Sequence, residues 1–542
     1  MKLSELAETY DVIAKAKSDP QRVRIMADLM RGSDTRSLAA IAHFTAGEIV
    51  DPALSNTLGI GPGTILDAMA RLAGKERSAI DDEVRESGDI SALAARYAGG
   101  GDDTLTVANL WRRINRVVER DEPREKLIAH IFSHTTPNGA RYFTRMLLNQ
   151  MRIGVGFGTL TRSIARAFNA DANQLQRLYA LSNSIGLVAT QAKKGNLART
   201  GLTLFRPYQF MNAQKIDDPA EIFAKLAGKQ ILFEVKYDGA RLQIHIGEGD
   251  PVPIKLYSRR LNDVTDSLPD VVAALRKGWK GGSAIIEGEA VPFDATLTQK
   301  QPFQAVLTRL GRKYDIDVAA REMPFILYLF DILYDAGRDM MDVPQSERRG
   351  RLSKLVRISK RLGLTEARIS DRREEEREFF ARAIGEGQEG LVAKDPDAIY
   401  LPGKRTEYWM KIKPAFETLD VVVVGGIWGS GRRRGMLSSL VVAVRDGEEF
   451  RTVGKVGTGF SEESLRRLTA TLEPLIVTAR GRDVAIEPSI VIEVDFQGIQ
   501  KTNAYTSGYA LRIPRFKRER IDKSIREADT VERLVRLYGS YH

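Results

Sequence analysis

The first part of the chain places apolar side chains at helical spacing. Near the start, apolar positions recur at i, i+3, i+4 and i+7, which is the pattern of one buried helical face. These positions are Leu3, Leu6, Ala7, Tyr10, Ile13 and Ala14. Comparable segments recur at 110–120 and 140–151, and turns containing Gly, Pro or Asp separate them. The pattern predicts an all-helical domain over residues 1–205.

The pattern changes near Phe205. From Ile231 onward, short β-rich runs alternate with helical stretches, which predicts a mixed α/β domain over residues 206–415. Beyond that, short strand-like runs alternate with glycine-rich turns, as in DVVVVGGIWG and IVIEVDFQ. This last pattern predicts a small β-barrel over residues 416–542. The whole chain is therefore expected to be multidomain.

Composition narrows the class of protein. A length of 542 residues favours three or four domains, and 43% hydrophobic with 28% charged residues is typical of globular proteins. The absence of cysteine excludes disulfides, thiolate zinc sites and a cysteine nucleophile, and only five histidines are present. No apolar run is long enough to span a bilayer, and the start lacks the apolar core of a signal peptide. We therefore expect a cytoplasmic protein with no membrane partner.

The charge distribution favours a polyanionic partner. The net charge is +11 and the pI is about 9.5. From Arg141 to Phe205 there are nine Lys or Arg residues and one acidic residue, and from Lys501 to Lys523 there are seven and two. Two basic stretches far apart in sequence predict a nucleic acid that more than one domain contacts.

One short pattern occurs twice in the helical part, at 58–74 and at 152–168. In each copy, glycines precede a helix whose first turn carries a threonine. The matching positions are Gly59, Gly61, Gly63, Thr64, Ala70 and Arg71 in the first copy, and Gly154, Gly156, Gly158, Thr159, Ala165 and Arg166 in the second. Free amides at a helix N-terminus form phosphate sites, although either copy alone is better explained as a helix–helix turn.

Two copies in a basic, helical domain favour paired contacts to a nucleic-acid backbone. A dinucleotide site is disfavoured because no strand precedes either glycine run. The predicted contact residues are Gly61, Gly63, Gly156, Gly158, Arg71 and Arg166.

The strongest chemical signal lies at 234–241, which reads EVKYDGAR. Period-two alternation puts Ile231, Phe233 and Val235 on one apolar face. Glu234 and Lys236 therefore point to the opposite face. The Asp-Gly pair that follows is expected to turn the chain into a second strand. In isolation, such a segment is most simply a hairpin with a solvated lysine.

Other polar motifs follow in or beside strand-like runs. They are Ser258-Arg259-Arg260, Glu287-Gly288-Glu289, Phe330-Asp331, the segment 389–394 and the segment 409–413. In the last of these, WMKIK, alternation points Lys411 and Lys413 to the same side. A cleft lined by strand edges would gather such residues.

These motifs, in this order, resemble those of covalent nucleotidyltransferases, and more closely those of ATP-dependent DNA ligases of the archaeal and eukaryotic replicative type. The KxDGxR motif matches 236–241, and the C-terminal RxDK motif matches 520–523. The helical part is similar to the family's DNA-binding domain, so the resemblance spans nearly the whole chain. It implies an all-α DNA-binding domain, an α/β adenylation domain and a C-terminal OB-fold β-barrel.

The resemblance also implies a reaction. Lys236 attacks ATP, releases pyrophosphate and carries AMP as a phosphoramidate, with Mg²⁺ (or Mn²⁺) as the metal. AMP then passes to the 5′-phosphate of a nick in double-stranded DNA, and the 3′-hydroxyl displaces it. A lysine is only about 0.1% neutral near pH 7.5, so it needs activation. Lys411 and Lys413 would lower the pKa of Lys236 and hold the α-phosphate.

Roles for the remaining motif residues follow from the same resemblance. Adenine would contact Phe330 and Glu234; ribose and phosphate would contact Arg241, Arg259 and Glu289; and the metal would be held by Glu289 and Glu389. The other nucleotide-binding residues would be Arg405, Lys411, Lys413, Arg520, Asp522 and Lys523, the last three of which orient pyrophosphate. Lys394 lies five residues after Glu389, so strict alternation separates the two unless a bulge or strand end intervenes.

The implied setting is a monomer that works on nicked DNA in replication, repair or recombination, in the cytoplasm at the nucleoid. A sliding clamp stays an open partner, since no clamp-binding peptide is recognised. Two features depart from the family pattern: 205–215 lacks Pro-Met-Leu-Ala, and Lys517 stands where a smaller apolar residue is frequent.

The alternatives are an RNA ligase, another covalent nucleotidyltransferase such as a capping guanylyltransferase, and a non-catalytic nucleic-acid-binding protein. The large helical domain and the terminal RxDK favour a DNA ligase over the first two. Intact Lys236, Glu289, Glu389 and Lys413 argue against the third. An NAD-dependent ligase is disfavoured because its zinc module uses cysteines.

Overall fold

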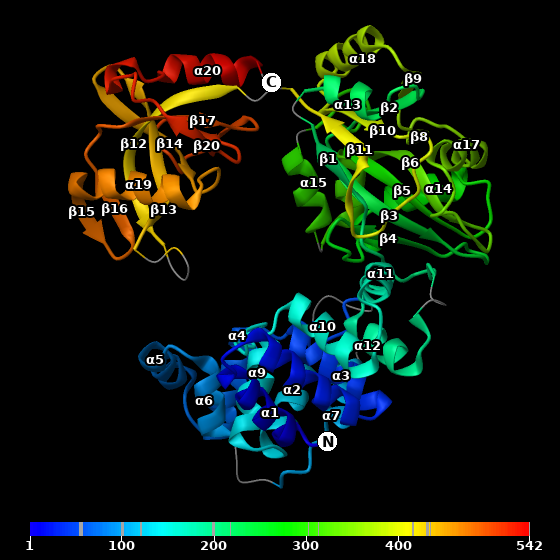
Figure 1. The fold of residues 1–542 in the computed structure, drawn as a ribbon, viewed down its shortest axis with the longest axis vertical. Coiled ribbons are helices and arrows are strands. Elements are labelled where there is room, and N and C mark those ends of the chain that lie inside the picture. The colour runs from blue at the N-terminus through cyan, green and yellow to red at the C-terminus, as the bar shows by residue number, and fades with distance from the viewer. Residues whose placement is uncertain are drawn as a thin grey trace. The chain divides into compact units, whose positions relative to one another are not determined.

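The computed structural model (Figure 1) describes residues 1–53, 58–98, 102–119, 122–197, 201–216, 218–301, 303–312, 314–414, 417–429, 433 and 435–540. It divides into two compact units, Met1–Lys413 and Pro414–His542. Among the residues described, none of the helices combines the length and the apolar character needed to cross a membrane.

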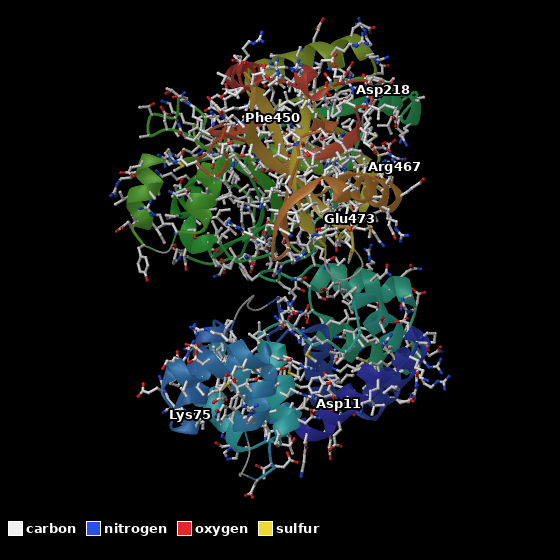
Figure 2. All side chains as sticks on the ribbon, turned by 90° about the vertical axis from the view of Figure 1, so that its left-hand side faces the viewer. Asp11, Lys75, Asp218, Phe450, Arg467 and Glu473 are labelled. Carbon is white, nitrogen blue, oxygen red and sulfur yellow. The ribbon has the colours of Figure 1, made fainter. Side chains whose placement is uncertain are left out.

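The first unit begins with helices, as the sequence predicts. They are α1 (Leu3–Lys15), α2 (Asp19–Gly32), α3 (Thr35–Ala46), α4 (Pro62–Ala73), α5 (Arg77–Ser87), α6 (Ile90–Tyr97), α7 (Val107–Val118), α8 (Arg124–Ser133), α9 (Pro137–Leu147), α10 (Phe157–Phe168), α11 (Ala172–Ser182) and α12 (Ile185–Lys194). Their apolar faces share one core, which runs from Leu3 to Leu197. Asp11 on α1 (Figure 2) joins this helix to α9, because it accepts hydrogen bonds from Asn138 at 2.9 Å and Tyr142 at 2.8 Å.

Helix α1 buries most of the predicted face. Leu3, Leu6, Ala7, Tyr10 and Ile13 are fully buried. Ala14 is exposed, so its assignment to the buried face is wrong. The helix ends at Lys15, and its last turn is covered only on the side of Ile13.

Beyond these helices, the described residues of the first unit form two main sheets. The five-stranded sheet has the order β1 (Asn212–Lys215), β11 (Arg405–Ile412), β10 (Gly390–Lys394), β2 (Ile231–Lys236) and β9 (Ala367–Ser370). The six-stranded sheet has the order β4 (Ile254–Ser258), β3 (Ala240–Ile246), β5 (Ala284–Pro292), β6 (Phe325–Asp335) and β7 (Arg338–Asp339), with β8 (Leu362–Leu364) beside β6. The helices of this part are α13 (Ala220–Lys225), α14 (Pro269–Gly278), α15 (Phe303–Leu310), α16 (Ile316–Glu322), α17 (Gln345–Leu355) and α18 (Arg373–Gly385).

Strands β2 and β3 do not form the hairpin that the Asp-Gly turn predicts. Strand β2 pairs with β10 and β9, whereas β3 pairs with β4 and β5, so the turn crosses from one sheet to the other. A Cβ at Gly239 would lie 2.4 Å from the carbonyl oxygen of Ala290. Only glycine lets the backbone pass this close to β5. The crossing leaves Lys236 at the end of its strand.

The two sheets share a core. Phe330 and Leu333 from β6 and Ile285 from β5 belong to the same buried cluster as Trp409 from β11. The rings of Phe330 and Trp409 meet edge to face at 6.1 Å between centres. This cluster fixes the spacing between the two sheets on the side that carries the polar motifs.

The second unit is rich in strands, as predicted. Its strands are β12 (Thr418–Trp428), β13 (Leu437–Asp446), β14 (Glu449–Val456), β15 (Ile476–Arg480), β16 (Asp483–Ile486), β17 (Val491–Asp495), β18 (Ile499–Lys501), β19 (Tyr509–Leu511) and β20 (Arg515–Glu519), and its helices are α19 (Glu462–Leu472) and α20 (Val531–Ser540). Strand β12 pairs with β13 and β17, β13 pairs with β14, and β17 pairs with β20. A parallel bridge between Thr458 and Arg515 joins the ends of this series, which closes a small barrel around one apolar core.

A buried ion pair links β6 to α17. Arg348 Nε lies 2.8 Å from Asp331 Oδ1 and its Nη2 lies 3.0 Å from Oδ2, and both side chains are fully buried. Arg348 also donates to the carbonyl oxygen of Ala398 at 3.2 Å. Asp331 therefore serves the fold, although it lies in a motif that sequence analysis associates with the active site.

We expect Asp331→Ala to lower the free energy of unfolding of this part by about 3–5 kcal/mol, because it leaves the Arg348 charge buried and unpaired. The measurement is the denaturant midpoint of the β6 peptide in pulsed hydrogen exchange. Asp82→Ala, which breaks an exposed pair with Arg85 on α5, should change the stability of its own region by less than about 1 kcal/mol. Equal effects of the two substitutions would contradict a structural role for the buried pair.

Candidate active site

Three charged side chains meet where β2, β10 and β11 run side by side. Lys236 is the last residue of β2, Glu389 directly precedes β10, and Lys413 directly follows β11. Because β10 pairs with both other strands, the two lysines reach Glu389 from either side. Lys236 Nζ donates to one carboxylate oxygen of Glu389 and Lys413 Nζ to the other. Burial raises the pKa of Glu389, but the two lysines outweigh this effect and hold the pKa below its ordinary value.

Gly390 explains how Glu389 joins this group. Its φ is +136°, and a Cβ there would lie 2.1 Å from the carbonyl oxygen of Ile412. The chain turns at this point, where no other residue fits. Glu389 therefore contacts Lys236, while Lys394 contacts Glu234 on the same face of β2. The strand end supplies the irregularity that the spacing of Glu389 and Lys394 requires.

Glu234 is buried between two cations. Its Oε2 lies 2.6 Å from Lys394 Nζ, and its Oε1 accepts a hydrogen bond from Arg349 on α17. The Lys394 ammonium lies 4.9 Å from the ring centre of Phe330 and 4.3 Å from that of Trp409. An oriented carboxylate beside aromatic rings suits a flat base that carries an amino group.

Arg241 forms a wall of the same region. Its Nη2 donates to Glu287 Oε2 at 2.6 Å, and its guanidinium lies 5.5 Å from the ring centre of Phe330. The other oxygen of Glu287 accepts hydrogen bonds from the hydroxyls of Tyr208 and Tyr400, each at 2.6 Å. This network fixes the orientation of Arg241.

Two further predicted residues lie in the electrostatic field of Lys236. Burial raises the pKa of Glu289 on β5 to about 7, against the lowering effect of Lys236 and Arg241. Burial, together with the charges of Lys413, Arg405 and Lys236, lowers the pKa of Lys411 on β11 to about 8. Lys411 and Lys413 thus share a side, as alternation predicts.

Arg259 and Arg405 lie at the margin. Both are exposed, Arg259 just after β4 and Arg405 at the start of β11. Arg405 acts electrostatically on Lys411 and donates to the carbonyl oxygen of Ala213 at 3.3 Å. Among the described residues Arg259 forms no ion pair. Of these two arginines, Arg405 is therefore the one that interacts with the charged group.

The C-terminal motif residues form a separate group within the second unit. Arg520 Nε donates to Asp522 at 2.9 Å, and its Nη1 donates to Asp420 on β12 at 2.7 Å. Lys523 Nζ donates to the same Asp420 at 2.6 Å. Asp420 was not predicted, although a charge at the start of an apolar strand is a signal that singles it out.

Sequence reasoning missed three residues of the first unit that contact the predicted ones or act on them electrostatically. Arg349 contacts Glu234, and Glu287, noted only as part of a motif, holds Arg241. Lys300 follows β5 and acts electrostatically on Lys236, Glu289 and Glu389. No motif marks Lys300 or Arg349, because both reach the site only through the fold.

Two carboxylates are available for a metal ion. Within the described part of the chain, no three His, Cys, Asp or Glu side chains are grouped so that they would hold a metal by themselves. Glu289 and Glu389 interact electrostatically with each other and with Lys236. This donor set fits Mg²⁺, which commonly binds through one or two carboxylates together with phosphate oxygens and water.

The two glycine–helix units have matching geometry. Gly61 and Gly156 are the N-caps of α4 and α10, and neither helix has a side-chain cap. Gly59 and Gly154, two residues earlier, have φ of +67° and +69°. The uncapped backbone amides at both helix starts could donate hydrogen bonds to an anion. A pocket of about 370 Å³ lies at the glycine–helix copy that precedes α10, lined by residues 45–47 and 149–156.

The arginines beside these glycines differ from the predicted ones. Arg71 and Arg166 are exposed but lie in the last turns of α4 and α10, away from the glycines at the helix starts. Instead, Arg124 Nη1 donates to the carbonyl oxygen of Gly59 at 3.2 Å. Arg22 lies against Gly154, with its Nε 3.0 Å from where a Cβ would stand.

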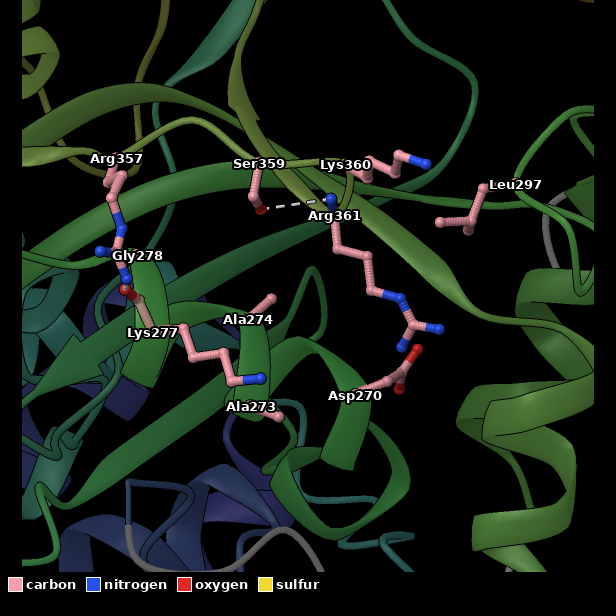
Figure 3. A pocket seen from close by; sticks show the side chains of 10 residues that line it. All are labelled: Asp270, Ala273, Ala274, Lys277, Gly278, Leu297, Arg357, Ser359, Lys360 and Arg361. Atoms are coloured by element: carbon pink, nitrogen blue, oxygen red, sulfur yellow. Dashed lines mark hydrogen bonds between the residues drawn. The ribbon is translucent and has the colours of Figure 1, made fainter.

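Figure 3 shows a larger pocket in the first unit. Its volume is about 440 Å³, and it lies between α14 and the segment 357–361. Lys277, Arg357, Lys360 and Arg361 are among its lining residues, but none of the predicted site residues is. The candidate active site is therefore the group of charged side chains around Lys236, which is chosen for its chemistry.

The chain matches three protein-family descriptions in succession. They are "DNA ligase N terminus" over residues 2–165, "ATP dependent DNA ligase domain" over residues 210–413 and "ATP dependent DNA ligase C terminal region" over residues 433–523.

Relatives with assigned names match the chain from end to end. The DNA ligase of Thermococcus fumicolans is 38% identical over 555 residues, which is 99% of this chain and 98% of the relative. The DNA ligase of Archaeoglobus fulgidus is 37% identical, again over 99% and 98%. A solved structure named Pmar-Lig_PreS3 shares the fold, with a TM-score of 0.57 and 18% identity over 95% of this chain and 99% of its own. The motifs and these full-length matches agree, and the chain belongs to the ATP-dependent DNA ligase family.

Proposed function

We propose that this DNA ligase seals nicks in duplex DNA through AMP bound covalently to Lys236. The observation that carries the proposal is the contact of Lys236 with Glu389, beside Lys413 and a buried group suited to a purine. We further propose three working parts, which are a DNA-binding domain at 1–205, an adenylation domain at 206–415 and an OB-fold domain at 416–542.

Lys236 acts as the nucleophile. Its neutral amine attacks the α-phosphorus of ATP, the bond from that phosphorus to the bridging oxygen breaks, and pyrophosphate leaves with the bonding electrons. The amine must first lose a proton, and Glu389 is the acceptor in direct contact with Nζ. Lys411 and Lys413 hold the α-phosphate oxygens, on which charge builds during the transfer.

Adenine is recognised by Glu234. Its carboxylate accepts a hydrogen bond from the 6-amino group, whereas guanine would present a carbonyl oxygen that the carboxylate repels. Arg349 and Lys394 hold the carboxylate in place, and Phe330 supplies an aromatic contact. This arrangement favours ATP over GTP.

Mg²⁺ would be held by Glu289 and Glu389, and it would neutralise phosphate charge during each transfer. Arg241, Arg259 and Arg405 would contact ribose and phosphate. Arg520, Asp522 and Lys523 would orient the pyrophosphate in the first step.

DNA is gripped by the helical domain. The uncapped helix starts at Gly61-Gly63 and Gly156-Gly158 bind backbone phosphates on the two sides of the nick. Arg71 and Arg166 extend these contacts along α4 and α10, where both are exposed.

Lys236→Ala should abolish formation of the protein–AMP adduct, with a loss of at least about 10³-fold, because the nucleophile is gone. Intact-protein mass after incubation with ATP and Mg²⁺ measures the adduct, and a gel-shift assay should show unchanged binding of nicked DNA. Lys255→Ala, at an exposed lysine that pairs with Asp263, is the matched control and should label fully. Full labelling of Lys236→Ala would sink the assignment.

Glu389→Ala and Lys236→Ala should separate on DNA that already carries AMP at the nick. The covalent task of Lys236 is then finished, so its loss should slow sealing less than about tenfold, while loss of a metal carboxylate should cost about 10²-fold or more. The measurement is the rate of sealing of pre-adenylylated nicks with excess enzyme. Equal losses in the two variants would contradict this division of tasks.

Gly61→Leu and Gly156→Leu should each weaken binding of nicked DNA about tenfold, equivalent to ~1.4 kcal/mol, without affecting AMP labelling. A Cβ at either position meets no atom within 4 Å, so the protein itself tolerates the side chain. Gly32→Leu on α2, where a Cβ also meets nothing within 4 Å, is the control. Arg166→Ala and Arg71→Ala should lower the slope of log affinity against log salt by about one per lost phosphate contact. Unchanged affinity and slope in all four variants would leave the repeat as a packing feature only.

A further inference from the structure

Lys300 is a cation near the candidate active site that belongs to none of the sequence motifs. It lies in the segment between β5 and α15, where its backbone bridges to Phe293. Its Nζ donates to the carbonyl oxygen of Gly387 at 2.9 Å and to Gln388 Oε1 at 3.2 Å. These two residues directly precede Glu389 in the chain.

The charge of Lys300 faces the reacting group. The charged side chains that act on its ammonium are Asp238, Glu389 and Glu289, which attract it, and Lys236, which repels it. The side chain is partly buried, so solvent screens these interactions only in part. Lys300 thus interacts electrostatically with three carboxylates, while its hydrogen bonds go to neutral acceptors on Gly387 and Gln388.

The turn at 386–388 sets the position of Glu389. On its far side, Gly387 and Gln388 donate backbone hydrogen bonds to the end of α18, at Ile384 and Ala383, each at 2.9 Å. Beyond the turn, the Glu389 N–H donates to the carbonyl oxygen of Lys236 at 2.9 Å. Lys300 donates two further hydrogen bonds to the same turn, from the segment that follows β5. The backbone that carries Glu389 is therefore held by α18, by β2 and by Lys300 together.

We propose that Lys300 is a positioning residue for AMP transfer. It locks the turn 386–388 so that Glu389 meets Lys236 and the metal in the reactive geometry. The inference rests on the proposed role of Glu389 and adds a residue that acts through it.

The expected signature is a loss of rate with little change in nucleotide binding. Lys300→Met keeps the length of the side chain but removes both hydrogen bonds. It should slow single-turnover AMP transfer about 10- to 100-fold, because misplacing a catalytic group by about 1 Å has effects of this size. The ATP concentration for half-maximal rate should change less than about twofold. Lys300→Arg, which still donates to both acceptors, should recover most of the rate.

Three comparisons test the proposal with the full-length enzyme. Gln388→Ala removes one acceptor and should cost part of what Lys300→Met costs, while Lys255→Met on the surface should cost nothing. In a Glu389→Gln background, Lys300→Met should add less than about a twofold loss, because the residue through which it acts is already impaired. Thermal midpoints of all variants should stay within a few degrees of the parent, as judged by circular dichroism.

Two outcomes would overturn the proposal. Multiplicative losses in the double variant would mean that Lys300 acts independently of Glu389. A raised half-maximal ATP concentration with an unchanged maximal rate would make it a phosphate ligand instead. Failure of the proposed function would look different, since the unmodified protein would then form no AMP adduct or Glu389→Gln alone would keep its full rate.

Discussion

Glu389 accepts hydrogen bonds from two lysines, and the arrangement of the whole adenylation region follows from the need to bring these three side chains together. Lys236, Glu389 and Lys413 lie at the ends of three different strands, and the central position of β10 between β2 and β11 makes the contacts possible. Burying such charges is costly unless each has a partner. The strand order, the glycine at 390 and the turn held by Lys300 all serve that pairing.

The crossing between the two sheets places residues of both sheets around Lys236. Because the chain leaves β2 at Lys236 and enters the other sheet at Ala240, the proposed nucleophile stands where the two sheets meet. Residues of the six-stranded sheet, including Arg241 and Glu289, then face residues of the five-stranded sheet across the core formed by Phe330 and Trp409. A hairpin would have kept β2 and β3 in one sheet, so the crossing is what brings residues of both sheets to Lys236.

Local patterns predicted what depends on local geometry. Alternation in β2 correctly separated Phe233 and Val235 from Glu234 and Lys236. Helical spacing correctly identified the buried face of α1, apart from Ala14, which it included although the residue is exposed. Pairing between distant segments has no such local signature. The sheet change after Lys236, the contact of Arg349 with Glu234 and the position of Asp420 beneath Arg520 all depend on tertiary register. Sequence analysis missed Lys300 for the same reason, because its hydrogen-bond partners, Gly387 and Gln388, lie far from it in the sequence.

The proposed chemistry explains why several lysines lie around Glu389 in addition to Lys236. Attachment of AMP replaces the positive ammonium of Lys236 with a phosphoramidate whose phosphate is negative, so the local charge changes sign beside Glu389. That carboxylate would then repel the adduct unless other cations remain. Lys413 already contacts Glu389, Lys411 lies on the same side of β11, and Lys300 acts on the same carboxylates from the opposite loop. The first step does not consume these three cations. In the proposed chemistry, they therefore balance the negative charges of the Glu389 carboxylate and the AMP phosphate during the second and third steps.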